Sequence, residues 1–268
     1  MTKRTFLTLA VATTGLYLTN ASQASSVLFD ANLASPTSTA QPGWYNGTGN
    51  PNGGFTVVDG LKGVEIGLRA KYRQNAGVID NPLGNVYNVV TGPQTALTSG
   101  GAGDPTKAAW NYEFSVDVAP NGVFNGPLLL SLTTAQLTFT DNLGHTATVN
   151  PYTYWSDNSG WGPSGKTNGL LVGGWGAQNS ENPNFGDFPL APFFDMNANA
   201  TYTIQLDLFF GASTSPAALL ASDQIVVVVG DGGPAAVPVP AAAWAGLSTM
   251  GGIGVVSFMK RRRRNSRL

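Results

Sequence analysis

The sequence of 268 residues contains no cysteine and a single histidine, His145. The absence of cysteine excludes disulfide bonds, thiolate metal ligands and cysteine nucleophiles. One histidine is too few for a metal site built on several imidazoles, and no Gly-x-Ser-x-Gly elbow is present for a serine hydrolase. The inventory of residues therefore argues against nucleophilic triads and His-based metal centres, and we assign no catalytic residue.

Charged side chains are scarce, at 11% of the residues, and most of the basic ones lie at the two ends. Lys3 and Arg4 stand near the start, and six more basic residues follow position 259. Without both ends, six basic and all 15 acidic side chains remain, which gives a net charge of about −9. Such an acidic region lacks the Lys and Arg clusters that bind phosphate, so nucleic acid is not an expected partner.

Sustained helical periodicity is also missing between the two ends, whereas short strand patterns recur between clusters of Gly, Pro and Asn. This composition predicts an all-β domain over residues 25–229, an antiparallel β-sandwich with a jelly-roll-like arrangement. About 205 residues can bury a proper core without disulfide bonds. The expected strands are 27–29, 55–58, 63–69, 85–90, 110–118, 128–132, 135–140, 145–149, 201–210 and 225–229.

The clearest strand pattern covers residues 110–118, where apolar residues alternate with Asn111, Glu113, Ser115 and Asp117. Because side chains alternate across a strand, the pattern predicts one buried face and one solvated face. Residues 201–210 repeat this alternation. Residues 225–229 are uniformly apolar, which favours a central strand that is buried on both faces. One or two helical turns are expected at 216–222.

The N-terminus has the three parts of a secretory signal peptide. Lys3 and Arg4 precede an uncharged, mostly apolar stretch over residues 5–18, and small residues then lead to Ala24. This order predicts a signal peptide over residues 1–24, cleavage after Ala24 and export by the Sec machinery.

The C-terminus reads as a membrane stop. Residues 230–236 have the composition of a flexible linker, and residues 241–259 carry no charge. These 19 residues would span roughly 28 Å as a helix, close to the thickness of a bilayer core. A basic tail at 260–268 follows, so the tail is expected in the cytoplasm and the rest of the chain outside. The basic stop consists of Lys260, Arg261, Arg262, Arg263 and Arg264.

A Pro-x-Pro motif, one span and an Arg-rich end occur in that order over residues 237–268, which resembles the PEP-CTERM sorting signal of exported bacterial proteins. The similarity is greatest to the Val-Pro-Leu-Pro-Ala variant of this signal. Val239 stands at the Leu position, and the Glu of the parent Pro-Glu-Pro motif is absent. The matching residues in the motif (237–244) are Val237, Pro238, Pro240, Ala241, Ala242 and Trp244.

The resemblance implies recognition by exosortase, a membrane-embedded cysteine protease-transpeptidase that removes the tail in the envelope. It also implies an association with exopolysaccharide or biofilm, and a cell-surface or extracellular location after processing. Residues 110–115, 178–182 and 202–204 are similar to β-rich ectodomains of other PEP-CTERM proteins, a similarity that carries no activity with it.

Paired carboxylates are the main enzymatic alternative, because glycosidases on jelly rolls use two acids that flank the scissile bond. The glutamates of this chain are Glu65, Glu113 and Glu181. Glu65 and Glu113 fall on polar faces of expected strands, where they point either into a cleft or simply into solvent. Convergence of two of the three in a cleft would favour an enzyme.

Sugar binding and calcium binding are the alternatives for the long segment 152–199, which is rich in Gly and Asn. Trp155, Trp161 and Trp175 either present flat faces to a polysaccharide or cover the core beneath the loop. Calcium would find oxygen ligands at Asp141-Asn142, Asp157-Asn158 and Asp187, although none of these matches the spaced calcium loop. Asp and Asn are also ordinary turn formers, so no metal ligand is assigned.

Taken together, these features predict an exported cell-surface or matrix protein with a non-catalytic structural or adhesive role. Its expected partners are the Sec machinery, exosortase, the membrane before processing, and exopolysaccharide. The alternative is a carbohydrate-binding module or a glycoside-active enzyme on a jelly-roll scaffold.

Overall fold

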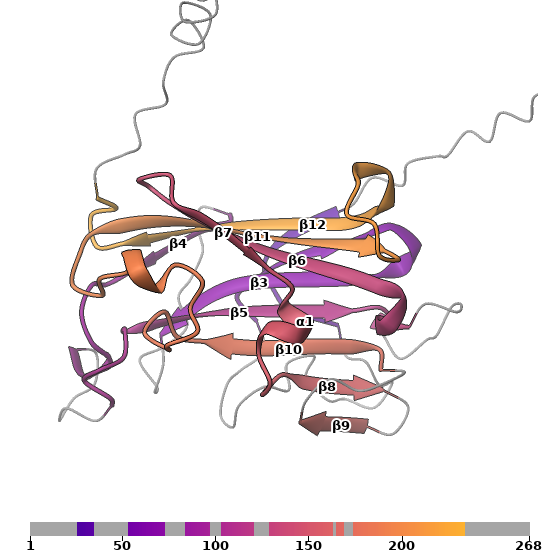
Figure 1. Ribbon diagram of the computed structural model, residues 1–268, viewed down its shortest axis with the longest axis horizontal. Coiled ribbons are helices and arrows are strands. Elements are labelled where there is room, and N and C mark those ends of the chain that lie inside the picture. The colour runs from indigo at the N-terminus through magenta and orange to yellow at the C-terminus, as the bar shows by residue number, and fades with distance from the viewer. Residues whose placement is uncertain are drawn as a thin grey trace, which may run out of the picture.

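Two β-sheets form the molecule in the computed structural model, which describes residues 26–34, 53–72, 84–96, 103–120, 129–162, 165–168 and 174–233 (Figure 1). The seven-stranded sheet has the order β1 (Ser26–Ala31), β2 (Phe55–Asp59), β3 (Glu65–Tyr72), β5 (Trp110–Asp117), β10 (Gly176–Glu181), β8 (Ser159–Gly162) and β9 (Gly165–Asn168). The five-stranded sheet has the order β4 (Val86–Val89), β12 (Leu219–Val229), β11 (Ala200–Phe210), β6 (Thr133–Asp141) and β7 (Thr146–Val149). The expectation of an all-β fold is confirmed.

Helical structure among the described residues is limited to short pieces. These are the helix α1 (Pro151–Tyr154) and the 3-10 turns Leu61–Gly63, Gln94–Ala96, Leu130–Leu132, Ala191–Phe193 and Pro216–Ala218. None of the helices in this part of the chain is long and apolar enough to cross a membrane. The expected signal peptide, sorting motif, membrane helix and basic tail lie outside the described residues.

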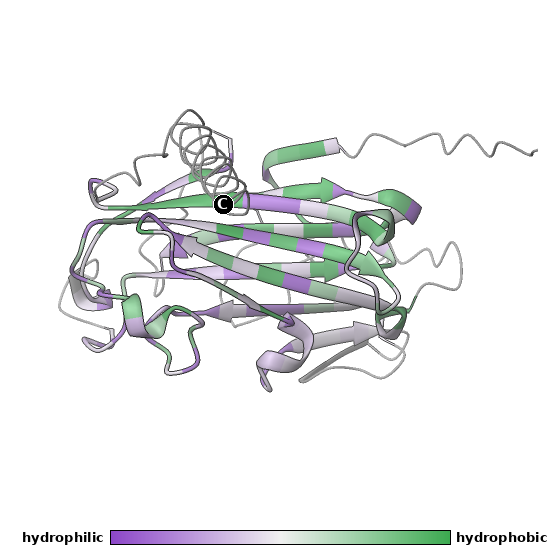
Figure 2. Cartoon of the chain, turned by 45° about the horizontal axis from the view of Figure 1, so that its top comes forward, coloured by the Kyte–Doolittle hydropathy of each residue, from purple (hydrophilic) through white to green (hydrophobic). Residues whose placement is uncertain are grey.

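The core lies between the two sheets and is built by alternation along the strands. On β5, Trp110, Tyr112, Phe114 and Val116 point inward and are at most 1% exposed. On β11, the inward positions between Tyr202 and Leu208 are buried in the same cluster. Burying each large apolar side chain contributes about 1.5–3 kcal/mol. Figure 2 shows the resulting alternation of hydrophobic and hydrophilic residues along the strands.

The prediction of a solvated face on β5 is wrong, because all eight residues of this strand are buried. Its outer face is an interior surface. Over the neighbouring strands, Leu33, Phe55 and Val57 form a small apolar cluster of their own. Gly67 leaves room for Leu33, since a Cβ at this glycine would lie 2.6 Å from the Leu33 Cδ2 atom. Alternation tells which side chains share a face, but it does not tell whether something covers that face.

Other elements differ from the sequence-based expectation. Residues 130–132 form a 3-10 turn instead of a strand, and only a 3-10 turn at 216–218 precedes β12. Val226 and Val228 on β12 are half-buried, so this strand is covered fully on its inner side alone. The segment 152–199 is not one long loop, since α1, β8, β9 and β10 lie in or overlap it.

One strand pair departs from the antiparallel arrangement that we expected. The edge strand β4 runs parallel to β12, with Val86 opposite Val226 and Val89 opposite Val229. The chain between these two strands passes through both sheets, so no hairpin forces them to be antiparallel. The five-stranded sheet is therefore mixed.

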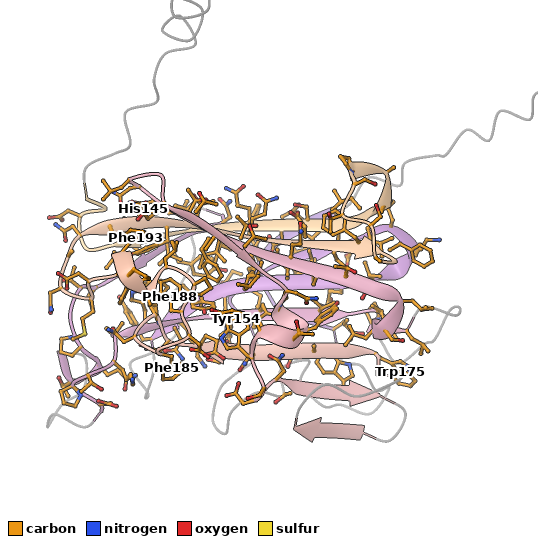
Figure 3. All side chains as sticks on the ribbon, viewed as in Figure 1. His145, Tyr154, Trp175, Phe185, Phe188 and Phe193 are labelled. Carbon is orange, nitrogen blue, oxygen red and sulfur yellow. The ribbon has the colours of Figure 1, made fainter. Side chains whose placement is uncertain are left out.

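The expected hairpin at 135–149 is present as β6 and β7, and Asp141 fixes its turn. The carboxylate of Asp141 accepts hydrogen bonds from the backbone N–H groups of Leu143 (2.8 Å) and His145 (2.9 Å). It also lies 2.6 Å from the His145 Nδ1 atom. The His145 ring stacks on Phe193 at 3.8 Å (Figure 3). Burial alone would raise the pKa of Asp141, but the bonds with His145 and Leu143 lower it.

Candidate functional site

The outer face of the seven-stranded sheet carries most of the buried charge in the described part of the chain. Strands β3, β5 and β10 lie side by side, and their outward positions are polar or charged. Arg69 is opposite Glu113, and Glu65 is opposite Asp117. The outward polar side chains are Glu65, Arg69, Lys71, Asn111, Glu113, Ser115, Asp117, Gln178 and Ser180, and all except Ser180 are buried.

Arg69, Lys71 and Glu113 form a triad at the centre of this face. The Arg69 Nε atom donates to the Glu113 Oε2 atom at 2.5 Å, and Lys71 Nζ pairs with the other carboxylate oxygen. Arg69 also donates to the Gly53 carbonyl and lies 4.0 Å from the centroid of the Phe55 ring. Because a buried charge is tolerated only when it is paired and hydrogen-bonded, this triad satisfies Glu113 from both sides.

Glu65 and Asp117 form a pair of carboxyl groups farther along the same two strands. The Ala34 N–H lies 3.0 and 3.1 Å from the two Glu65 carboxyl oxygens. Burial raises the pKa of Glu65 to about 8 against that hydrogen bond, and the neighbouring Asp117 raises it further. Burial likewise raises the pKa of Asp117 to about 7, opposed by the Ala119 N–H and the Trp161 side chain. Glu65 therefore holds its proton at neutral pH.

The glutamates do not meet in the pairs that we considered from the sequence. Glu65 and Glu113 share a face, but the strand register separates them by four residues, or about 13 Å along the strand. Glu181 is opposite Tyr112 and lies on the inner face of the sheet. The carboxyl pair that does form on the outer face is Glu65 with Asp117, and Asp117 had not been singled out.

The structure places Trp155 and Trp175 against the core between the sheets, and Trp161 on the outer face of the seven-stranded sheet. Trp155 is 3% exposed and stacks on Phe114 with ring centroids 5.9 Å apart. Trp161 is also 3% exposed, and its ring lies across Gly176 so closely that a Cβ there would be 1.9 Å from the Trp161 Cζ2 atom. Trp175, labelled in Figure 3, is half-buried against the core. Trp155 and Trp175 thus pack on the core, whereas Trp161 packs over Gly176 on the outer face of β10.

Three of the residues considered for calcium, Asp141, Asp157 and Asn158, bond with other protein groups. Asp141 holds the β6–β7 turn, and the Asn158 side chain donates to the Pro151 and Trp155 carbonyls. Asp157 accepts from Asn179, and Asp187 is exposed. Among the residues that the structure describes, no group of three or more Asp, Glu or His side chains is arranged to hold a metal ion.

One signal in the sequence pointed to the triad. Residues 65, 67, 69 and 71 alternate with apolar residues, as residues 111–117 do. The first stretch carries the basic residues Arg69 and Lys71, and the second carries the acidic residues Glu113 and Asp117. Opposite charges on the matching faces of two consecutive strands indicate a cross-strand pair. Comparison of the chain with protein-family models, curated proteins and solved structures finds no match.

Proposed function

We propose that this chain is an exported cell-surface or matrix protein, sorted through its C-terminal motif, with a non-catalytic structural or adhesive role beside exopolysaccharide. Its signal peptide directs it to the Sec machinery, and its tail holds it in the membrane until exosortase acts. The β-sandwich, with a jelly-roll-like arrangement, is the part that remains at the surface. The sorting signal supports the proposed delivery to the cell surface or matrix, and the β-sandwich supports the proposed structural or adhesive role.

The observation that carries the non-catalytic role is the triad around Glu113. The fully buried carboxylate bonds with two cations on the adjacent strand. A general acid must give its proton to a leaving group, and a nucleophile must reach the substrate. A carboxylate that two cations hold in the interior is suited to neither task, but it is suited to joining β3 and β5. The charged face thus supports a structural role.

The sorting step is tested by replacing Pro238 and Pro240 with Ala in the native host. We expect the variant to accumulate in the membrane at full length, because the motif that exosortase recognises is gone. Pro234→Ala, in the linker, is the matched control and should be processed normally. Intact-mass measurement of protein from envelope and medium reads out both ends of the chain. Normal removal of the tail from the double variant would contradict the assignment.

A glycoside-active enzyme is the second candidate, and the Glu65–Asp117 pair favours it. Directly opposed side chains on antiparallel strands have Cβ atoms about 4.5–5.5 Å apart, and retaining glycosidases hold their carboxyl groups about 5–5.5 Å apart. The raised pKa of Glu65 suits a general acid. The release of reducing ends from the host's exopolysaccharide tests this alternative. Activity that Glu65→Gln and Asp117→Asn abolish, while Asp207→Asn does not, would establish it over the non-catalytic role.

A further inference from the structure

A second polar group lies on the inner face of the seven-stranded sheet, away from the triad. On β10, Asn179 and Glu181 occupy the inner face, opposite Phe114 and Tyr112 of β5. Asp157, in the turn after α1, reaches the same place. Trp155, at the C-terminal end of α1, stacks on Phe114 beside this group. Figure 3 labels Tyr154, the last residue of α1.

The Asn179 side chain brings two carboxylates together. Its Nδ2 atom donates to the Asp157 Oδ1 atom at 3.0 Å and to the Glu181 Oε1 atom at 2.6 Å. The two carboxylate oxygens are therefore separated by at most about 5.6 Å, the sum of those distances. Asp157 is exposed and Glu181 is 3% exposed, so the group extends from solvent into the interior.

Two buried donors beside this group have no hydrogen-bond partner among the residues that the structure describes. They are the Tyr112 hydroxyl and the Trp155 Nε1 atom. Tyr112 is fully buried, which raises its pKa well above the ordinary value, and the Glu181 and Asp187 carboxylates raise the pKa further. In the strand register, Glu181 is directly opposite Tyr112, so the two side chains share the inner face of the sheet. Leaving a buried donor unsatisfied costs about 1–3 kcal/mol, so this arrangement is unfavourable unless a ligand completes it.

We propose that Asp157, Asn179, Glu181, Tyr112 and Trp155 form a binding site for one sugar residue of a neutral polysaccharide. Carboxylates accept hydrogen bonds from sugar hydroxyls, and the Tyr112 hydroxyl and Trp155 indole donate to sugar oxygens. Tyr154 is 42% exposed, and its ring meets Trp155 edge to face at 5.1 Å, so it offers an apolar surface next to the polar group. The acidic side chains disfavour an anionic polymer.

This site makes the proposed function more specific, because it names the class of ligand. It depends on the proposed function only for the source of the sugar. Its test is isothermal titration calorimetry on the processed protein purified from the host. The probes are cellohexaose, maltohexaose, xylohexaose and the host's own exopolysaccharide. The account expects binding of at least one probe without added metal.

Two variants distinguish a loss of sugar binding from a loss of the folded structure. Tyr112→Phe removes only an unpartnered hydroxyl, so the folded protein should be at least as stable, while affinity falls roughly 2- to 10-fold for one lost neutral hydrogen bond. Asp157→Asn changes an exposed side chain and should weaken binding roughly 10-fold or more, as expected for a hydrogen bond to a charged group. Asp207→Asn, on the other sheet, is the control and should bind as the parent does.

Three results would overturn the site. They are the absence of binding to every probe, unchanged affinity in both variants, or binding of Ca²⁺ alone that Asp157→Asn removes. Failure of the proposed function would give a different experimental result from failure of the site. Protein that is never processed or never found with exopolysaccharide, but still binds an oligosaccharide through Asp157, would refute the function and leave the site in place.

Discussion

The outer faces of the two sheets are built from the same alternating pattern and have opposite characters. On the five-stranded sheet, the outward residues of β6, β7 and β11 are mainly threonine and glutamine, half-buried or exposed. Asp207 is the single charged residue among them, and it accepts hydrogen bonds from Gln205. On the seven-stranded sheet, the outward residues of β3 and β5 are largely charged, and they are buried.

The difference teaches how each face is stabilised. The threonines pair across strands, as Thr138 does with Thr148 at 2.9 Å, and solvent supplies whatever else they need. The charged face is buried from solvent, so Arg69, Lys71 and Glu113 must neutralise one another's charges. Removal of a threonine should therefore cost little, whereas removal of one member of the triad leaves charges uncompensated in the interior.

The largest effect should come from Glu113→Gln. This change removes the negative charge that balances Arg69 and Lys71, and breaking a buried pair in this way costs about 3–5 kcal/mol. Urea unfolding of the purified protein measures the loss in the free energy of unfolding. Thr138→Val on the opposite face is the matched control and should cost less than about 1 kcal/mol. Equal losses in the two variants would remove the contrast between the faces.

A pH dependence of stability should separate the faces next. On the charged face, Glu65 and Asp117 have folded-state pKa values raised by burial to about 8 and 7, well above their unfolded values. Their contribution is therefore fully present near pH 4 and is lost as the pH rises toward 8, because only the unfolded state ionises freely. The free energy of unfolding should fall by on the order of 2 kcal/mol or more between pH 5 and pH 9.

Asp117→Asn should flatten that decline, because asparagine stays neutral at the same buried position on the charged face. Asp207→Asn, on the half-exposed face, should leave the slope unchanged. Urea midpoints at pH 5, 7 and 9 for the three proteins give the comparison. A stability that rises between pH 5 and pH 9 would show that these carboxyl groups are not buried as described.

A smaller effect is expected at Gly176, where the charged face meets Trp161. An alanine Cβ would lie 1.9 Å from the Trp161 ring, so the indole must move, at a cost of about 1–3 kcal/mol. Gly186→Ala has open space around the added Cβ and serves as the control. Thermal unfolding monitored by tryptophan fluorescence follows both variants. A Gly176→Ala protein as stable as the control would mean that Trp161 does not cover this strand.

The alternation of apolar and polar residues along the sequence predicts much of the fold. It predicts little of the candidate site. It located β5, β11 and the β6–β7 hairpin, because those strands carry a periodic apolar face and a turn with Asp141 and Gly144. It failed for the outer face of β5, because alternation shows which side chains share a face but not whether that face is covered. The Asn179 bridge was equally hidden, since Asp157 lies in a turn 22 residues away whose position the strand pattern does not predict.

The measurement that tests the buried, charged face most directly is the rate at which its lysine reacts. Lys71 is paired with Glu113 and is 7% exposed, whereas Lys62 lies on an exposed turn. Acetylation of the folded protein with acetic anhydride, followed by peptide mass spectrometry, compares the two amines in one sample. The account predicts modification of Lys62 while Lys71 stays protected until the protein unfolds. Equal labelling of both lysines in the folded protein would contradict it.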